Sequence, residues 1–297
     1  MSKNIKMIAL DLDGTTFNSR GTISGETLGA LEWAHLNGIH VVVCTGRVWD
    51  KLPSEIFKIK GLEYVITCNG AMITDVLNSE VIYENPISPD SVETVMEILK
   101  NESFSVDVSI GGKAYIDAGE YYDIKENGSD FRSPDYVLNT RYPVKNLNDF
   151  VIKNKTCVEN INMVFRNLSD QRRMEHVLSS LDNITITSSF HNNLEVGGET
   201  TTKANALLFL LEKLGLTDEH LMAFGDSPND LSMLQMAKIG VVMGNAGEHI
   251  KCQGDFWCDT YVYSYYYCTN THIPKKSQNR RMNFVFISLF YTFRTKA

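Results

Sequence analysis

The chain has few cysteines, the residues whose disulfides stabilise many small secreted proteins. Its 297 residues include six cysteines, and no two of these are separated by only two positions. Neither a disulfide framework nor a common zinc module is therefore indicated, and His249, Cys252 and Cys258 match no zinc-binding spacing. Cys44 and Cys68 lie in apolar segments, where free cysteine packs as a small hydrophobe. This usage predicts a reducing, cytoplasmic location.

Long hydrophobic runs are also missing. The longest uncharged apolar stretch near the end of the chain, residues 283–293, is shorter than the roughly 20 residues that a membrane-spanning helix needs. The N-terminus has no basic stretch followed by an apolar segment, so we expect no secretory signal peptide. We therefore predict that the protein has no membrane partner.

Positive charge is in short supply. The 28 lysine and arginine residues are outnumbered by 36 aspartate and glutamate residues, which gives a formal net charge of −8. A general nucleic-acid binder needs a basic surface, so we expect no nucleic-acid partner. The hydrophobic fraction of 43% is ordinary for a globular protein, and the length suits two packed units.

Apolar segments near the N-terminus alternate with helical ones. Residues 5–10, 39–44 and 65–68 are typical of strands buried on both faces, and Ser24 can cap a helix between the first two. Such alternation predicts a parallel sheet with helices on both of its faces. Polar residues that follow the strands of such a sheet line the crevice where ligands bind.

The middle third of the chain has a different pattern. Helical segments there are separated by strand-like ones at residues 104–110, 113–117, 160–165 and 184–189, which favours an antiparallel sheet. Parallel-type elements then resume with a helix over residues 204–214. We therefore predict an α/β fold: a doubly wound parallel sheet core at residues 1–81 and 192–260, with an inserted α+β cap domain at residues 82–191.

The last segment, residues 261–297, differs in composition from the rest. Aspartate and glutamate are absent after Asp259, while tyrosine and phenylalanine become dense. This abrupt change motivates the hypothesis that the encoding DNA carries a reading-frame change, which could compromise folding. Resequencing the gene and finding the same frame intact would contradict it.

Two aspartates follow the first predicted strand. Asp11 and Asp13 are two positions apart, so in an extended strand end both carboxylates would face one crevice. Two carboxylates repel each other and a phosphate group, and a divalent cation such as Mg²⁺ would resolve both conflicts. Gly14 permits a turn in which the backbone approaches a ligand closely.

Further polar clusters occupy equivalent positions. Thr45 and Gly46 follow the second strand, where a hydroxyl and free backbone N–H groups form a phosphate seat. Asp226 follows a later strand, with Asp230 one helical turn beyond it. Lys203 begins a helix and could present its ammonium group to the same crevice, although a lone lysine is usually a solvated surface charge.

Taken together, these segments resemble the haloacid dehalogenase-like hydrolases, and within them the Cof-type sugar-phosphate phosphatases. The resemblance rests on DLDGTT at residues 11–16, CTGR at 44–47, NGA at 69–71, TTKANAL at 201–207 and GDSPNDLSML at 225–234. It extends to about Glu248. These ordered motifs, four of which follow predicted strands directly, make a specific signature.

The resemblance implies a Mg²⁺-dependent phosphatase. Asp11 would attack phosphorus and form an aspartyl-phosphate, while Asp13 would act as general acid and then as general base. The implied catalytic residues are Asp11, Asp13, Thr45 and Lys203. The implied phosphate-binding residues are Thr45, Gly46, Asn69, Lys203 and Asn229. The implied metal site comprises Asp11, Asp13 through its backbone carbonyl, Asp226 and Asp230.

Two alternative functions share these residues. A phosphomutase would use the same acid pair but return the phosphoryl group to the sugar, and a catalytically silent regulatory protein would only bind phosphate esters. In each case the partner is a small-molecule phosphate ester, and we expect a monomer or a weak homodimer. Arg141, Lys145 and Arg166 of the cap could meet a sugar or a second phosphate, but each is expected at the surface.

Overall fold

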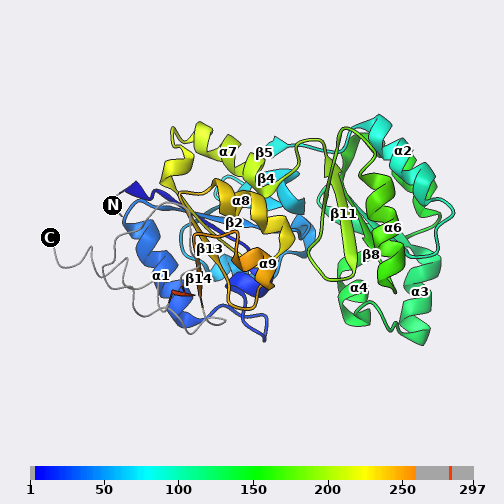
Figure 1. Ribbon diagram of the computed structural model, residues 1–297, viewed down its shortest axis with the longest axis horizontal. Helices are drawn as coiled ribbons and strands as arrows, with labels where there is room; N and C mark the ends of the chain where they lie inside the picture. The colour runs from blue at the N-terminus through cyan, green and yellow to red at the C-terminus, as the bar shows by residue number, and fades with distance from the viewer. Residues whose placement is uncertain (1–3, 259–280, 283–297) are drawn as a thin grey trace.

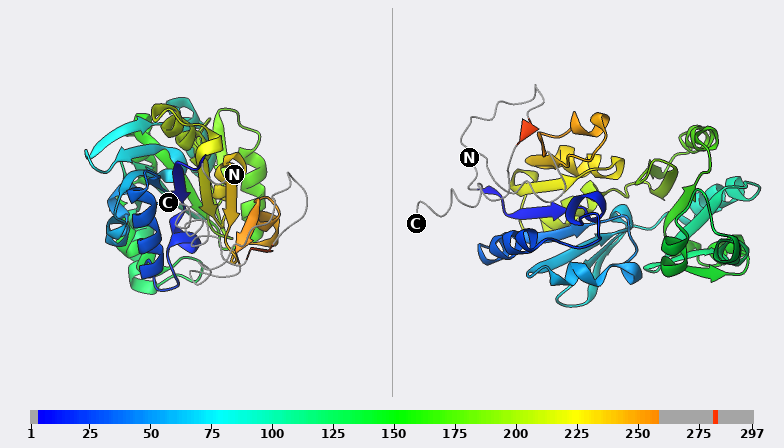
Figure 2. Two further views of the ribbon diagram at one scale, coloured as in Figure 1. Left: turned by 90° about the vertical axis from the view of Figure 1, so that its left-hand side faces the viewer. Right: turned by 90° about the horizontal axis from the view of Figure 1, so that it is seen from below.

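The computed structural model describes residues 4–258 and 281–282. The chain forms two bodies that lie side by side, a larger one containing both ends of the described chain and a smaller one made of its middle third (Figures 1 and 2). The smaller body interrupts the larger, as the sequence predicts. Apart from strand β15 (Arg281–Met282), the atypical segment 261–297 lies outside the described residues.

The core is a single sheet of nine strands within the described residues, in the order β15-β14-β13-β12-β1-β2-β3-β4-β5. The strands are β1 (Met7–Leu10), β2 (His40–Cys44), β3 (Leu62–Thr67), β4 (Met72–Asp75), β5 (Glu80–Glu84), β12 (Leu221–Gly225), β13 (Ile239–Val242), β14 (Phe256–Cys258) and β15. From β15 to β3 all neighbours are parallel, and β4 and β5 add an antiparallel edge that the sequence pattern did not reveal. The predicted doubly wound parallel core is confirmed.

Helices cover both faces of this sheet because its strands are apolar on both sides. Alternate residues of β1 separate into two clusters: Met7 and Ala9 pack against helix α7, whereas Ile8 and Leu10 pack against helix α1. Ser24 caps α1 by accepting a hydrogen bond from Thr27 N, as expected. The core helices are α1 (Gly25–Leu36), α7 (Lys203–Lys213), α8 (Leu231–Met236) and α9 (Glu248–Lys251).

The cap has its own sheet of six strands, in the order β10-β11-β9-β6-β7-β8. The strands are β6 (Ser105–Ile110), β7 (Lys113–Asp117), β8 (Arg141–Val144), β9 (Val158–Val164), β10 (Ile184–Thr187) and β11 (Asn193–Gly198). The expected antiparallel pairing holds except between β7 and β8, which are parallel. Strand β11 pairs with β9 and β10, so residues 193–198 belong to the cap sheet and the second core segment starts after them, later than the predicted residue 192.

The two faces of the cap sheet differ in chemistry. One is apolar and packs against α2, α5 and α6, with Ile161, Met163 and Val196 at its centre. The helices of the cap are α2 (Pro89–Leu99), α3 (Ala118–Asn127), α4 (Pro134–Thr140), α5 (Leu147–Lys153) and α6 (Leu168–Leu178).

None of the helices within residues 4–258 is long and apolar enough to cross a membrane.

The other face of the cap sheet is polar and yet buried. Its side chains are Ser105, Asp107, Ser109, Asn160, Asn162, Asn193 and Glu195. Asp107, Asn162 and Glu195 stand opposite one another on adjacent strands and form one cross-strand row. Glu195 accepts a hydrogen bond from Asn69 of the core, so the Glu195 end of this face lies against the core, whereas Asp107 is covered by Arg132 and Arg141 of the cap. A buried polar face between two domains is typical of a ligand-binding crevice.

Candidate active site

Four neighbouring strands of the core deliver polar residues to one edge of the sheet. Asp11 follows β1, Thr45 follows β2, Asn69 follows β3 within a short 3₁₀ turn, and Asp226 follows β12. Because these strands are parallel, their carboxyl ends meet at the same edge. The structure therefore brings together the strand-end residues that the sequence motifs single out.

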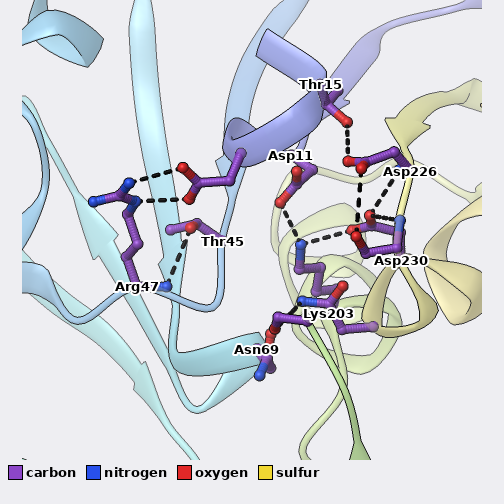
Figure 3. A network of polar contacts seen from close by, with 12 residues as sticks. Asp11, Thr15, Thr45, Arg47, Asn69, Lys203, Asp226 and Asp230 are labelled. Atoms are coloured by element: carbon purple, nitrogen blue, oxygen red, sulfur yellow. Dashed lines mark hydrogen bonds and ion pairs between the residues drawn. The ribbon is translucent and has the colours of Figure 1, made fainter. Parts of the chain in front are cut away.

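Lys203 lies at the centre of this group (Figure 3). Its ammonium Nζ donates to Asp11 Oδ1 and to Asp230 Oδ1, both at 2.7 Å, and its side chain is fully buried. Burial alone would lower the pKa of this lysine, but the two carboxylates outweigh that effect and raise it. Lys203 is therefore a fixed buried cation, and its position excludes the solvated surface role that is usual for a lone lysine.

Asp230 fixes the turn that follows β12. Its Oδ2 accepts hydrogen bonds from the backbone N–H of Asp226, at 2.9 Å, and of Ser227, at 3.0 Å. The Asp226 carboxylate is oriented by Thr15 Oγ1 at 2.9 Å and by Asn245 Nδ2 at 3.0 Å. Both carboxylates are thus engaged by the protein, but Asp230 is fully buried whereas Asp226 is partly exposed.

Three carboxylates are suitably arranged for a metal ion. Asp11, Asp226 and Asp230 each offer an oxygen, and these atoms lie within 4.8 Å of one another. Three carboxylates and one ammonium group leave a formal charge of −2, which one divalent cation would balance. An all-oxygen donor set is what Mg²⁺ prefers, so the residues present fit the ion that the sequence implies.

The titration of Asp226 reflects this excess of negative charge. Burial, and to a lesser degree the nearby Asp230 carboxylate, raise the pKa of Asp226 from 3.8 to about 6. A bound cation would oppose both effects by favouring the ionised carboxylate.

Gly14 allows the loop after β1 to pass close to Asp226. Its φ of +84° lies in the left-handed region, and a Cβ atom there would lie 2.4 Å from Asp226 Oδ2. Only glycine can occupy this position without displacing the carboxylate or straining the backbone. The sequence predicts a close approach of this turn to a ligand, whereas the group that it approaches in the structure is the Asp226 carboxylate.

The carboxylates of Asp11 and Asp13 were expected to face one crevice, but that of Asp13 is placed differently. Its carboxylate accepts two hydrogen bonds from Arg47, from Nε and Nη2, and it is not part of the three-carboxylate group found among the described residues. The two aspartates diverge because the backbone between them turns and does not continue as a strand. The carboxylate of Asp13 is therefore not grouped with those of Asp11, Asp226 and Asp230, and the metal contact implied for Asp13 is through its backbone carbonyl.

Thr45 and Gly46 form a tight turn beneath the cap. Thr45 is buried, and its Oγ1 accepts a hydrogen bond from Arg47 N at 3.1 Å. A Cβ atom on Gly46 would lie 3.0 Å from Asn69 Oδ1 and 3.4 Å from Ser189 Oγ of the cap. The predicted phosphate-binding position is thus closely surrounded by side chains, one of which is Ser189 of the cap.

Asn69 and Asn229 connect this seat to the cap. Asn229 Nδ2 donates to Asn69 Oδ1 at 2.9 Å and to Ser189 Oγ at 3.1 Å, while Asn69 Nδ2 donates to Glu195 Oε2 at 2.5 Å. Burial raises the pKa of the Glu195 carboxyl. Neither Ser189 nor Glu195 was predicted as a site residue from the sequence. The available signal was Glu195 itself, a charged residue inside a strand that is otherwise largely apolar.

The three basic cap residues that were considered as substrate contacts differ in their exposure. Arg166 is exposed and pairs with Asp130, and Lys145 is exposed, as expected. Arg141 is different, since its side chain is only 10% exposed and pairs with the buried Asp107 at 3.1 Å. The expectation of a surface position is wrong for this residue because the α4–β8 corner folds it onto the polar face of the cap sheet.

Comparison with known proteins agrees with this geometry. Residues 8–261 match the sequence profile of the haloacid dehalogenase-like hydrolases, so the match continues past Glu248, where the resemblance read from the motifs ended. The 5-amino-6-(5-phospho-D-ribitylamino)uracil phosphatase of Bacillus subtilis is 30% identical over 259 residues, which are 87% of this chain and 92% of that protein. Phosphatase YwpJ of the same organism is 30% identical over 272 residues, with 84% of this chain and 93% of that protein covered.

A solved structure has the same arrangement of domains. The structure of a haloacid dehalogenase-like hydrolase from Bacillus subtilis matches with a TM-score of 0.73 at 27% identity, over 85% of this chain and 94% of that chain. The inserted cap and the interrupted core therefore belong to a known architecture.

Proposed function

The chain belongs to the haloacid dehalogenase-like hydrolase family, and from that membership we propose that it is a Mg²⁺-dependent phosphatase of small phosphorylated metabolites that acts through an aspartyl-phosphate on Asp11. Membership confirms the family that the sequence motifs indicate. The observation that carries the proposal is the buried contact of Lys203 with Asp11 and Asp230 at the ends of parallel strands. It provides a nucleophile and a fixed cation in one water-excluding site.

Asp11 is the proposed nucleophile. One of its carboxylate oxygens would attack phosphorus, forming a phosphorus–oxygen bond while the bond to the leaving alcohol breaks. Lys203, Thr45 and the backbone at Gly46 would hold the phosphoryl oxygens, with Asn69 and Asn229 supporting that seat. Such transfer depends mainly on positioning and on neutralising charge.

Asp13 is the proposed general acid and base. It would give its proton to the departing oxygen, and would later take a proton from the water that releases phosphate from Asp11. In the structure, Asp13 is bound by Arg47 beside the crevice. A rotation that breaks this ion pair would bring the carboxylate to the leaving oxygen, so we propose that Arg47 holds Asp13 in a resting position.

Asp11 and Asp226 are the proposed main ligands of Mg²⁺, with Asp230 completing the acidic group and the backbone carbonyl of Asp13 as a further ligand implied by the family. Bound there, the ion would neutralise the phosphate and align it with the Asp11 carboxylate. Asp230 would serve chiefly to position Lys203 and the turn at Asp226, because it is fully buried, with one oxygen bound by Lys203 and the other by the backbone of that turn.

The proposed substrate class rests on the chemistry of the cap sheet above the site and on the printed name of one relative. The relative that is 30% identical over 259 residues is named for a phosphorylated ribitylamino compound, a small metabolite with a hydroxylated chain. In this chain the cap sheet presents a buried polar face to the core through Glu195. We therefore propose a small, hydroxylated phosphomonoester as substrate, enclosed between cap and core.

Phosphate release from a panel of sugar phosphates, nucleotides, flavin mononucleotide and pyridoxal phosphate tests this proposal. We expect turnover that requires Mg²⁺ and disappears in Asp11→Asn. An isomerised product with little free phosphate, and a need for a bisphosphate activator, would instead identify a phosphomutase. Binding without turnover, unchanged in Asp11→Asn, would identify a silent binding protein.

A further inference from the structure

A closed ring of four hydrogen bonds joins the cap to the core beside the proposed phosphate-binding position. Asn69 Nδ2 of the core donates to Glu195 Oε2 of the cap at 2.5 Å, and Ser189 Oγ of the cap donates to the same oxygen at 3.0 Å. Asn229 Nδ2 of the core completes the ring by donating to Asn69 Oδ1 and to Ser189 Oγ. Because two of these bonds cross between the domains, the ring exists only while the cap lies against the core.

Glu195 accepts hydrogen bonds on both of its carboxylate oxygens. Besides the two ring contacts on Oε2, its Oε1 accepts from Asn193 Nδ2 at 3.2 Å, and the side chain is buried. Each of these partners is a donor, and an ionised carboxylate offers two acceptor oxygens and no donor of its own. A glutamine in this position would have to point its NH2 group at one of the three donors. The ring therefore depends on the acid at residue 195.

The ring meets the core at a strained turn. Cys68 and Asn69 are consecutive residues in the left-handed region, with φ of +49° and +57°. Residues other than glycine seldom adopt this conformation, and those that do are held by their surroundings and concentrate at functional sites. The hydrogen bonds of the Asn69 side chain to Glu195 and from Asn229 are among the contacts that hold it.

Asn69 also contacts the turn that would hold the phosphoryl oxygens. Its backbone N–H donates to the carbonyl oxygen of Thr45 at 3.1 Å. Its side chain lies against Gly46, since a Cβ atom on Gly46 would be only 3.0 Å from Asn69 Oδ1. A shift of Asn69 would therefore shift the turn at Thr45 and Gly46.

We propose that Glu195 is a positioning residue that acts through Asn69. When the cap closes, Glu195 fixes the Asn69 side chain and thereby the turn at Thr45 and Gly46, so the phosphate-binding position is complete only in the closed protein. Phosphoryl transfer depends on such positioning, and its coupling to closure delays the transfer until the cap excludes bulk water. This inference rests on the proposed phosphatase function and deepens it.

The test uses Glu195→Gln, which preserves the size of the side chain but introduces a donor into the ring. Glu199→Gln is the matched control on an exposed glutamate. Loss of a hydrogen bond to a charged acceptor predicts that Glu195→Gln lowers kcat/KM about tenfold or more. The loss should be equal for ribitol 5-phosphate and phenyl phosphate, because the phosphate group is common to both. Calorimetric titration with inorganic phosphate in the presence of Mg²⁺ should show weaker binding, and the control should change none of these values.

A second variant separates positioning from a general loss of structure. Asn69→Gly retains the left-handed backbone and removes the side chain through which Glu195 acts. In this background Glu195→Gln should cause little further loss of phosphate affinity, since the two residues act as one unit. Additive losses would overturn the proposal. So would a loss confined to ribitol 5-phosphate, which would show a direct contact of Glu195 with the leaving group.

Ser189→Ala provides the same comparison if Glu195→Gln does not fold, because it removes two bonds of the ring from a half-buried loop. Phosphate binding requires no turnover, so it also separates this inference from the proposed function. Absence of turnover in the parent protein, together with weaker phosphate binding in Glu195→Gln, would reject the phosphatase function while supporting Glu195. Normal turnover with unchanged phosphate affinity and unchanged kcat/KM in the variant would do the reverse.

Discussion

The Arg47 guanidinium donates two hydrogen bonds, each 2.7 Å long, to the two carboxylate oxygens of Asp13. Such bidentate pairs are the strongest and most directional of the common ion pairs. Asp13 is 46% exposed despite this pairing, so it can exchange partners without a rearrangement of the core. Arg47 therefore holds Asp13, the proposed acid, beside the reacting centre but not within it.

Replacing Asp13 by asparagine should abolish proton transfer and leave the fold intact. We expect Asp13→Asn to reduce kcat by about 10²–10⁴, the usual contribution of a general acid or base. The phosphorylated protein should accumulate, because the water that hydrolyses it would lack a base. Stopped-flow phosphate release and intact-protein mass spectrometry measure these effects. Full activity in the variant would contradict the assigned role.

Replacing Lys203 should destabilise the protein as well as inactivate it. Lys203→Met leaves the buried carboxylates of Asp11 and Asp230 without their cation, which costs about 3–5 kcal/mol for a buried pair. Lys238→Met is the matched control, since Lys238 forms an exposed ion pair with Glu219 worth about 0–1 kcal/mol. Urea unfolding without Mg²⁺ measures both changes. Similar losses in the two variants would show that burial of Lys203 is not what matters.

The raised pKa of Asp226 makes stability and metal binding depend on pH in opposite ways. Folding without a cation favours the protonated carboxyl, so its stabilising contribution is complete below about pH 4 and is lost as the pH rises through about 6. The free energy of unfolding of the parent protein, relative to Asp226→Asn, should therefore fall by about 1 kcal/mol between pH 5 and pH 7.5. Mg²⁺ needs the ionised form, so its affinity should rise over the same interval.

Urea unfolding in a chelator and calorimetric titration with Mg²⁺, each at both pH values, measure these two trends. A difference between the parent protein and Asp226→Asn that is the same at both values would refute the assigned pKa direction.

A methyl group at residue 14 should disturb the metal site more than the fold. In Gly14→Ala the new Cβ would meet the Asp226 carboxylate, which must move. Gly21→Ala introduces the same left-handed strain, at φ +70°, with no atom within 4 Å of its Cβ. We expect similar losses of melting temperature in the two variants, but at least about a tenfold loss of Mg²⁺ affinity only in Gly14→Ala. Equal Mg²⁺ affinities would argue against Asp226 as a ligand.

Local patterns were sufficient to predict the core. The apolar strands, the Ser24 cap and the polar residues after each strand are encoded within short segments, and parallel pairing then places Asp11, Thr45 and Asp226 at one edge. The family resemblance added the role of Lys203, which its own sequence context would assign to the surface. These predictions rest on periodicity and topology, which depend little on side-chain detail.

Contacts between the two domains could not be predicted in this way. Glu195 and Ser189 lie in segments whose local pattern predicts an ordinary strand, and their contacts depend on the core that faces them. Arg141 was missed for a different reason, because it is buried against Asp107 of its own cap sheet. The pairing of Asp13 with Arg47 was missed because the backbone turns at Leu12, between Asp11 and Asp13, and so redirects a side chain that strand geometry would have aimed into the crevice.

The interruption of the core by the cap has a consequence for biosynthesis. Strand β1 leaves the ribosome well before its neighbour β12 and before the lysine that pairs with Asp11, because Lys203 is 192 positions further on. At translation rates of about 5–20 residues per second, Asp11 waits roughly 10–40 s for its partner. The cap strands, by contrast, are contiguous in the chain and can pair as soon as residue 198 emerges. A nascent chain therefore carries an unfinished β1–β2–β3 sheet with an open edge, the kind of surface that chaperones protect.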